Sequence, residues 1–184
     1  VVVRIASGSG AADLGMLIAL RPLAVLNFGV LDPASSVELR EHGVLVVPDV
    51  NDDSEAPRDP GIAKMQLEVL SRHGVRPIWF ATLDGTVEPF SADRFSALQQ
   101  LCAAEGLAPP GLLPVALDVE GGRRAMARIV GSGDAAAVAC YNDEVAMELL
   151  AGARELGVDV PGQVAVIGVD RSPVGQLWSP RLTT

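Results

Sequence analysis

Polar side chains that could bind a small molecule follow two apolar segments near the end of the chain. Asn142 and Asp143 come directly after the apolar run AAAVACY. Asp170 and Arg171 come directly after a second run, QVAVIGV. Amide and carboxylate oxygens accept hydrogen bonds from hydroxyl and amine groups, and bonds to an ionised carboxylate are among the stronger ones. If the two pairs converge, they could bind a hydroxylated or amine-bearing small molecule.

The elements that must position these residues form a strand, a helix and a strand. Uninterrupted apolar runs are typical of strands buried on both faces of a parallel sheet, so we expect strands over Ala135–Tyr141 and Gln163–Val169. Between them, apolar residues at helical spacing predict a helix over Asp143–Leu156, with Asn142 as N-cap and Gly157 as its stop. The carboxyl ends of such strands line the ligand crevice of an open sheet, which would bring the two polar pairs together.

Spacing alone leaves a simpler interpretation open. Asn142 would then only cap the helix, and Asp170 would only begin a turn. Because asparagine caps are common, spacing by itself favours this interpretation over ligand binding.

Four sequence blocks resemble the lactose-repressor/galactose-repressor (LacI/GalR) family of bacterial transcription regulators. They match the ligand-sensing part of that family in order and at the right intervals: Tyr141–Ala146, Arg154–Gly157 with Val160-Pro161, Val164–Asp170, and Ser179–Thr184. The resemblance shifts the balance for Asn142 and Asp170 towards ligand binding. It implies a two-lobed, periplasmic-binding-protein-like α/β fold with parallel sheets.

The same resemblance implies a division of the chain. Residues 1–55 would form a partial amino-terminal lobe, residues 56–181 a complete, doubly wound carboxy-terminal lobe, and residues 182–184 the start of a crossover back to the first lobe. The polar, proline-bearing stretch Val50–Pro60 has the composition of a linker. A DNA-binding headpiece is expected to precede Val1.

Hydrophobic runs and turn residues predict the remaining elements. In the first lobe we expect strands at Val1–Ala6, Leu23–Phe28 and Val44–Val47, with helices at Leu14–Leu20 and Ser36–Glu41. In the second lobe we expect helices at Gly61–His73, Ser91–Glu105 and Val119–Val130, with strands at Arg76–Thr82 and Leu112–Leu117. Pro114 indicates that the last of these strands lies at a sheet edge.

The ligand site of the family lies between the lobes. Matched by motif, Asn27 and Asp49 would contribute from the first lobe, and Asn142 and Asp170 from the second. Asp170 is the strongest candidate, because a carboxylate that accepts two hydroxyl hydrogen bonds suits a sugar-like ligand.

The chain departs from the family at one position. Many members carry a pocket arginine three residues before a Gly-aromatic pair, but here Arg94-Phe95 takes the place of that pair and Ser91 stands where the arginine would be. Arg94 lies on nearly the same helix face and could partly substitute, and Arg171 adds a possible cation. The alternative for Ser91 is that it simply caps its helix.

Composition argues against several functions. The formal net charge is −9 and Lys64 is the single lysine, whereas a duplex-binding surface needs clustered Lys and Arg. A dinucleotide fingerprint at Gly8 and Gly10 fails because Asp13 stands where its third glycine belongs. No G-x-S-x-G motif, metal-ligand spacing or membrane-length apolar run occurs. We therefore expect no enzyme, cofactor, metal or membrane segment, and we expect the two cysteines, Cys102 and Cys140, to be buried thiols.

Two functions remain as hypotheses. The first is the effector-sensing domain of a cytoplasmic LacI-type regulator, which would bind a sugar-like small molecule and contact operator DNA as a homodimer through a headpiece outside these residues. The alternative is an extracytoplasmic solute-binding protein of a sugar transport system, which shares the bilobed fold. The Val160-Pro161, Gly168–Asp170 and Ser179–Thr184 blocks favour the regulator.

Overall fold

The computed structural model describes residues 11–27, 31–47, 60–72, 74, 77–85, 89–118, 120–133 and 135–184. The chain divides into two compact units, Val1–Arg58 and Asp59–Thr184. The strand predicted at Val1–Ala6, and the predicted linker Val50–Pro60 apart from Pro60, lie outside the described residues.

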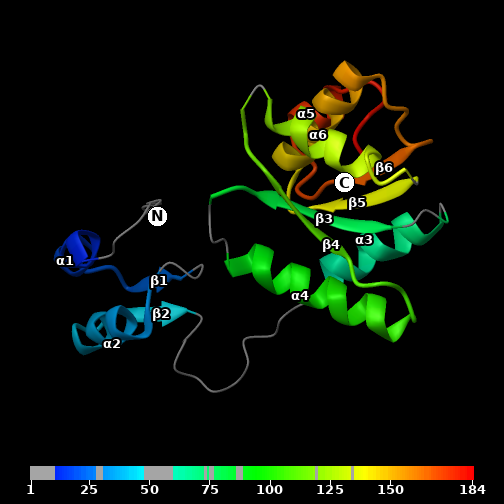
Figure 1. Ribbon diagram of the computed structural model, residues 1–184. Coiled ribbons are helices and arrows are strands. Elements are labelled where there is room, and N and C mark those ends of the chain that lie inside the picture. Colours follow the sequence, from blue (N-terminus) through cyan, green and yellow to red (C-terminus); the bar gives the residue numbers. More distant parts are fainter. Residues whose placement is uncertain are drawn as a thin grey trace. The chain divides into compact units, whose positions relative to one another are not determined.

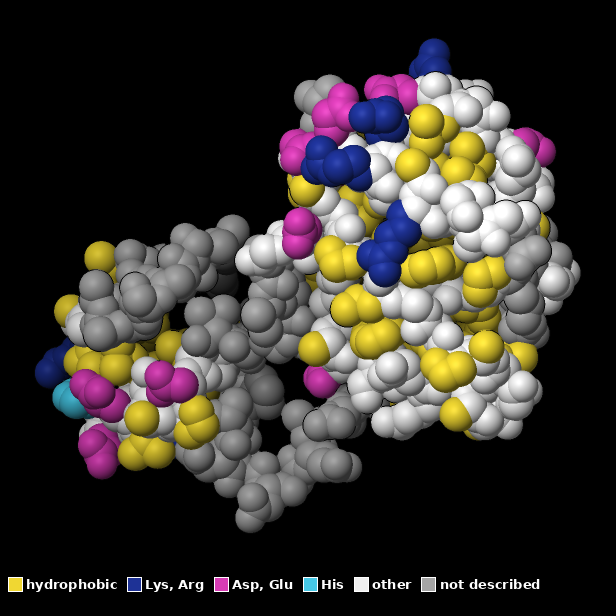
Figure 2. Space-filling model, in the orientation of Figure 1, with side chains coloured by type: hydrophobic (Ala, Val, Ile, Leu, Met, Phe, Trp, Pro, Cys, Tyr) yellow, Lys and Arg dark blue, Asp and Glu magenta, His cyan; other side chains and the backbone are white. Residues whose placement is uncertain are grey.

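The described part of the first unit is a two-stranded parallel sheet with two helices. Its elements are α1 (Ala11–Ala19), β1 (Ala24–Leu26), α2 (Pro33–Glu41) and β2 (Leu45–Val47). A small core is made by Leu14, Leu39, Val44 and Val46. Several large apolar side chains of this unit are nevertheless exposed, and Figure 2 shows hydrophobic side chains on its surface: Leu20, Leu23, Leu26, Leu45 and Val47.

Helix α2 begins three residues before the predicted Ser36, because the chain supplies a cap at Asp32. The Asp32 Oδ1 accepts a hydrogen bond from the backbone N–H of Ser35 at 2.7 Å, and Pro33 occupies the first turn, where its missing N–H costs nothing. The hydrogen bonds from Ser35 lower the pKa of the Asp32 carboxyl.

The second unit has a doubly wound α/β fold, as predicted. Its four parallel strands lie in the order β4-β3-β5-β6, with α3 and α4 on one face and α5 and α6 on the other (Figure 1). The elements in chain order are α3 (Gly61–Arg72), β3 (Ile78–Leu83), α4 (Pro89–Ala104), β4 (Gly111–Val115), α5 (Gly121–Val130), β5 (Ala136–Cys140), α6 (Asp143–Leu156), β6 (Val164–Ile167) and α7 (Pro173–Leu177).

The core of this unit lies on both faces of β5, all five residues of which are buried. Ala136, Val138 and Cys140 face the α5–α6 layer, while Ala137 and Ala139 face the α3–α4 layer. The uninterrupted apolar run therefore forms a strand that is covered on both faces, as the sequence predicted. Pro114 lies in β4 at the sheet edge, which confirms that prediction.

Two glycines let α5 and α6 approach closely. A Cβ placed on Gly122 would lie 1.8 Å from the backbone oxygen of Glu148, and one on Gly152 would lie 2.3 Å from the backbone of Gly122. Either position therefore excludes a side chain unless the helices separate. The contact presses α6 against the sheet, and α6 is the helix whose first residues lie beside the predicted site.

Candidate functional site

The structure brings the two predicted polar loops to the same edge of one sheet. The β5–β6 ladder ends with Ala139 opposite Ile167, and the strands are parallel. Asn142 and Asp170 each follow three residues after that last pair. The two loops therefore leave the sheet side by side at its carboxyl edge, where ligands of open α/β sheets bind.

Asn142 is the N-cap of α6, as predicted. Its Oδ1 accepts a hydrogen bond from the backbone N–H of Val145 at 2.9 Å, in an extended backbone conformation. The helix then ends at Gly157 in the left-handed conformation, with φ of 67°. Because the cap uses only the oxygen of Asn142, the Nδ2 donors of this half-buried side chain play no part in it.

Asp170 and Arg171 adopt an unusual backbone conformation. Their φ values are 102° and 51°, a region that residues other than glycine rarely occupy. Neighbouring bonds hold this turn: the N–H of Arg171 donates to Thr184 Oγ1 at 3.1 Å, and the N–H of Ser172 donates to Asp143 Oδ2 at 2.6 Å. Strain of this kind persists only where the surroundings enforce it, and it is concentrated at functional sites. The turn leaves the Asp170 side chain exposed.

Arg94 reaches the same edge from α4. A guanidinium N–H donates to the backbone oxygen of Tyr141, and the group lies over the Tyr141 ring at 5.2 Å from its centroid. Burial lowers the pKa of Arg94, while Tyr141 and the Asp170 carboxylate act in the opposite direction. The cation is thus fixed at the end of β5, within electrostatic range of Asp170.

Ser91 does not cap its helix. Helix α4 begins at Pro89, and Ser91 is only 5% exposed inside the first turn. Its hydroxyl shares a hydrogen bond of 2.5 Å with Thr82 Oγ1, which ties α4 to β3. The position that carries an arginine in many LacI/GalR members therefore holds a buried structural contact here.

Asn27 follows β1 in the first unit and is 4% exposed. Its Oδ1 accepts from the N–H of Leu31 at 3.0 Å, and its Nδ2 donates to the Leu31 oxygen at 3.3 Å. The amide of Asn27 is thus bonded to the backbone of Leu31 through both its oxygen and its nitrogen. Asp49, the other candidate from this unit, lies outside the described residues.

The model of one protein family matches most of the second unit. Residues 67–184 match the family described as periplasmic binding protein-like domain. The chain belongs to this family. The resemblance seen in the sequence and the predicted α/β class with parallel sheets are thereby confirmed.

Relatives of this periplasmic binding protein-like domain are transcription regulators. The HTH-type transcriptional regulator GalR of Escherichia coli (strain K12) is 43% identical over 68 residues, which are 36% of this chain and 20% of GalR. The HTH-type transcriptional regulator reg1 of Streptomyces lividans is 35% identical over 97 residues, which are 53% of this chain and 25% of reg1. The chain thus matches no more than about a quarter of either curated relative.

A solved structure supports the fold. A LacI family transcriptional regulator from Silicibacter pomeroyi superposes with a TM-score of 0.75 and 21% identity, over 92% of this chain and 67% of the other. This structure bears on the fold alone, whereas the curated relatives support the regulator hypothesis and give no support to the alternative of a transport protein.

Two buried polar residues form the framework of the site: Gln66, which the sequence did not single out, and Asp143, which it grouped with Asn142 as a possible ligand contact. Gln66 on α3 is 3% exposed, and its Nε2 donates to the backbone oxygens of Cys140 and Gly168, at 2.8 and 3.3 Å. Asp143 is 1% exposed, and it holds Ser172 from the other face of the sheet. A polar residue among apolar positions of a predicted helix was the only signal for Gln66.

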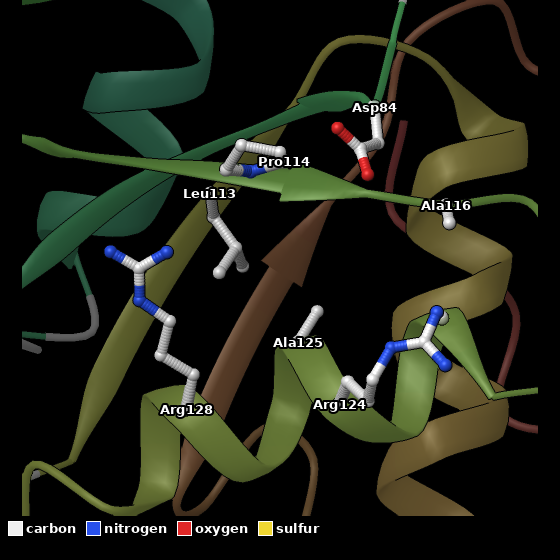
Figure 3. A pocket seen from close by; sticks show the side chains of 8 residues that line it. Asp84, Leu113, Pro114, Ala116, Arg124, Ala125 and Arg128 are labelled. Atoms are coloured by element: carbon white, nitrogen blue, oxygen red, sulfur yellow. The ribbon is translucent and has the colours of Figure 1, made fainter.

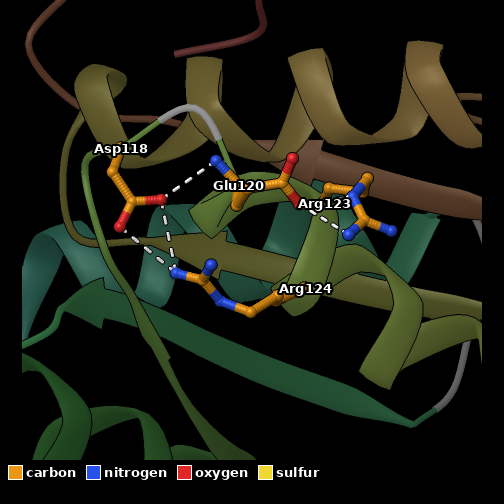
Figure 4. Close-up of polar contacts among 4 residues, drawn as sticks. All are labelled: Asp118, Glu120, Arg123 and Arg124. Carbon is orange, nitrogen blue, oxygen red and sulfur yellow. Dashed lines mark hydrogen bonds and ion pairs between the residues drawn. The ribbon is translucent and has the colours of Figure 1, made fainter.

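A pocket of about 150 Å³ lies elsewhere, between α5 and the edge strand β4 (Figure 3). Arg124 and Arg128 of α5 line it together with Asp84 and Pro114, but no predicted site residue does. Arg124 is paired with Asp118, and Arg123 with Glu120 (Figure 4). Arg128 lies over the Trp79 ring at 5.5 Å from its centroid.

Among the described residues, no group of three or more His, Cys, Asp and Glu side chains is placed to hold a metal ion. No described helix is long and apolar enough to cross a bilayer. Cys102 and Cys140 are buried thiols, as predicted, and burial raises the pKa of the Cys140 thiol.

Proposed function

We propose that this domain senses a small hydroxylated effector for a bacterial transcription regulator of the LacI/GalR type. The observation that carries the proposal is the placement of Asn142, Asp170 and Arg94 at the carboxyl edge of one parallel sheet. The names of the relatives GalR and reg1 support the regulator part of it.

The three side chains offer complementary chemistry to one ligand. The exposed Asp170 carboxylate accepts hydrogen bonds from two hydroxyl groups, the Asn142 amide donates, and Arg94 donates to an oxygen or an acidic group. A sugar-like molecule presents such groups on neighbouring carbons. Asp49 and Arg171 complete the proposed set of ligand-binding residues, and the buried Asn27 and Ser91 act on the site only by positioning, through their bonds to Leu31 and Thr82.

In this proposal the domain is not an enzyme, and its partners are the effector, a second copy of the protein and DNA. Operator DNA is bound by a headpiece outside these 184 residues, in the cytoplasm. Because two-fold symmetric proteins recognise two-fold symmetric sites, the intact protein acts as a homodimer on a near-palindromic operator. Effector binding at the sheet edge changes the affinity of the homodimer for operator DNA.

A thermal-shift screen of the full-length protein tests the proposal, with sugars, nucleosides and small acids as ligands. We expect at least one compound to raise the melting temperature and to change operator affinity in a fluorescence-anisotropy titration. Asp170→Asn should weaken binding of that compound about tenfold or more, because a hydrogen bond to a charged group is worth roughly 1.5–3 kcal/mol. Asparagine is preferable to alanine here, since it tolerates the left-handed backbone.

The control for this screen is Arg154→Gln, an exposed residue in the last turn of α6, at the opposite end of the helix from Asn142. This variant should bind the compound as the parent protein does. A compound that binds Asp170→Asn and the parent equally well would show that the effector site lies elsewhere.

A further inference from the structure

The β5–β6 ladder ends one step before the two ligand-bearing loops begin. Its last pair is Ala139 and Ile167, so the next residues along the strands are Cys140 and Gly168. Their backbone oxygens are bridged by a side chain, because Gln66 Nε2 donates to both, at 2.8 and 3.3 Å. Gln66 therefore extends the connection between β5 and β6 by one residue, at the point where the strands part.

Burying the Gln66 amide costs free energy, and the fold alone does not explain why the protein retains it. Gln66 is 3% exposed, and its Oε1 is buried and accepts no hydrogen bond from the residues that the structure describes. The opposite amide orientation would be worse, since it would place Oε1 against two carbonyl oxygens. An apolar side chain here would remove the unpartnered Oε1, but it would also take the donor away from the Cys140 and Gly168 oxygens, so the amide is retained for those two bonds. A buried polar group retained under those conditions needs a reason.

The reason is the position of the two proposed ligand-binding residues, each of which lies two residues beyond one of the bridged oxygens. Asn142 follows Cys140 by two positions, and Asp170 follows Gly168 by two positions. On the other face of the sheet, Asp143 accepts from the N–H of Ser172 at 2.6 Å and so holds the turn that carries Asp170. The separation of the two ligand-binding residues is thus fixed from both faces of the sheet.

We infer that Gln66 is a positioning residue of the effector site: it holds Asn142 and Asp170 at a fixed separation without touching the ligand. The inference rests on the proposed function, because the separation of Asn142 and Asp170 matters only if both residues bind the effector. Its physical content is independent of any ligand, because it states that the ends of β5 and β6 stay together through the Gln66 amide.

The test is amide hydrogen exchange by NMR on the 184-residue chain, with thermal unfolding measured in parallel. Gln66→Met keeps the length of the side chain and removes the donor. We expect the N–H groups of Tyr141, Gly168 and Ser172 to lose protection by about tenfold, which is the scale of one or two net hydrogen bonds. The N–H of Leu149 in α6 should keep its protection, and the melting temperature should change little, because the loss of the two bonds opposes the removal of the unpartnered Oε1. If Gln66 had only a general structural role, the N–H of Leu149 would lose protection together with those of Tyr141, Gly168 and Ser172.

In a second variant, the hydrogen-bond donor can be restored by lowering the pH. Gln66→Glu carries no donor when ionised but an O–H donor when protonated, and burial favours the protonated form. Protection at Gly168, corrected for intrinsic exchange, should therefore recover as the pH is lowered. The matched control is Gln99→Met on the exposed side of α4, which should leave all four amides unchanged.

Unchanged protection at Tyr141 and Gly168 in Gln66→Met would overturn the inference. So would a uniform loss that includes Leu149 together with a lower melting temperature, because Gln66 would then be part of the general core. Neither result affects the effector screen on the full-length protein, so a failure of this inference and a failure of the proposed function are distinguishable.

Discussion

Asn142 contributes different atoms of one amide to the helix and to the proposed ligand. Its Oδ1 caps α6, while the Nδ2 donors are not used by that cap. Asn142→Ala should therefore lower the free energy of unfolding of the second unit by about 1 kcal/mol, the usual cost of losing an N-cap. Urea denaturation followed by tryptophan fluorescence measures this, because both tryptophans, Trp79 and Trp178, lie in that unit.

Asn142→Asp is the control for that prediction. Aspartate caps a helix as well as asparagine does, so the stability should be retained, although the two amide donors are lost. Equal destabilisation by Ala and Asp would show that the cap is not the source of the effect.

Asp118 makes a small contribution to stability that depends on pH. The N–H of Glu120 donates to its Oδ1 at 2.9 Å and Arg124 pairs with it, and these bonds lower the pKa of Asp118 below its ordinary value of 3.8. A carboxyl whose pKa is lower in the folded state stabilises the fold above its unfolded pKa. That contribution is lost as the pH falls through the folded pKa. Because the group is exposed, the effect is small and is screened by salt.

Urea denaturation of the parent and of Asp118→Asn at several pH values tests this sign. The parent should be the more stable protein near neutral pH, and the difference should shrink as the pH falls below the ordinary pKa of 3.8 towards the lowered one. A difference that grows on acidification would contradict the assignment.

At the scale of elements, the crossing of α5 and α6 is the most sensitive contact of the second unit. Gly122→Ala places a methyl group 1.8 Å from the backbone oxygen of Glu148, so the helices must separate. We expect a loss of at least about 1–3 kcal/mol, the usual range for overpacking. Thermal unfolding followed by circular dichroism measures it.

Gly15→Ala in α1 is the corresponding control. Nothing lies within 4 Å of a Cβ at this position, and alanine favours a helix over glycine. This variant should be neutral or slightly stabilising. Equal destabilisation of both variants would show that glycine itself, and not the close approach of α5 and α6, is what matters.

The sequence predicted elements well where local signals were complete. Helix α6 has the predicted bounds because Asn142 and Gly157 mark both ends, and the apolar run of β5 marks a strand covered on both faces. Helix α7 was not predicted, since five residues show no helical period.

The site was less predictable than the fold, because its framework depends on contacts between distant segments. Gln66 lies 74 and 102 residues from the two backbone oxygens that it bridges. Arg94 lies 47 residues from Tyr141, whose oxygen anchors it. The left-handed backbone of Asp170 also has no local sequence signal, since that conformation is enforced by Asp143 and Thr184 from outside the turn.

At the scale of the whole molecule, charge decides the relation to DNA. The 184 residues carry a formal net charge of −9, and protein binding to a duplex depends on neutralising phosphates with Lys and Arg. We expect no binding of the isolated chain to an operator-length duplex in a fluorescence-anisotropy titration, even at low salt. The full-length protein is the positive control, and sequence-specific binding by the 184 residues alone would contradict the prediction.

Pro114 also affects how the protein behaves at high concentration. Proline has no N–H, so within β4 it is tolerated only where that group would point away from β3. The outer edge of β4 therefore lacks one donor that a strand from another molecule would need. Unprotected strand edges are the route by which sheet proteins aggregate and form fibrils. A single proline at the rim thus helps to keep neighbouring molecules from extending the sheet, while the ladder to β3 remains intact.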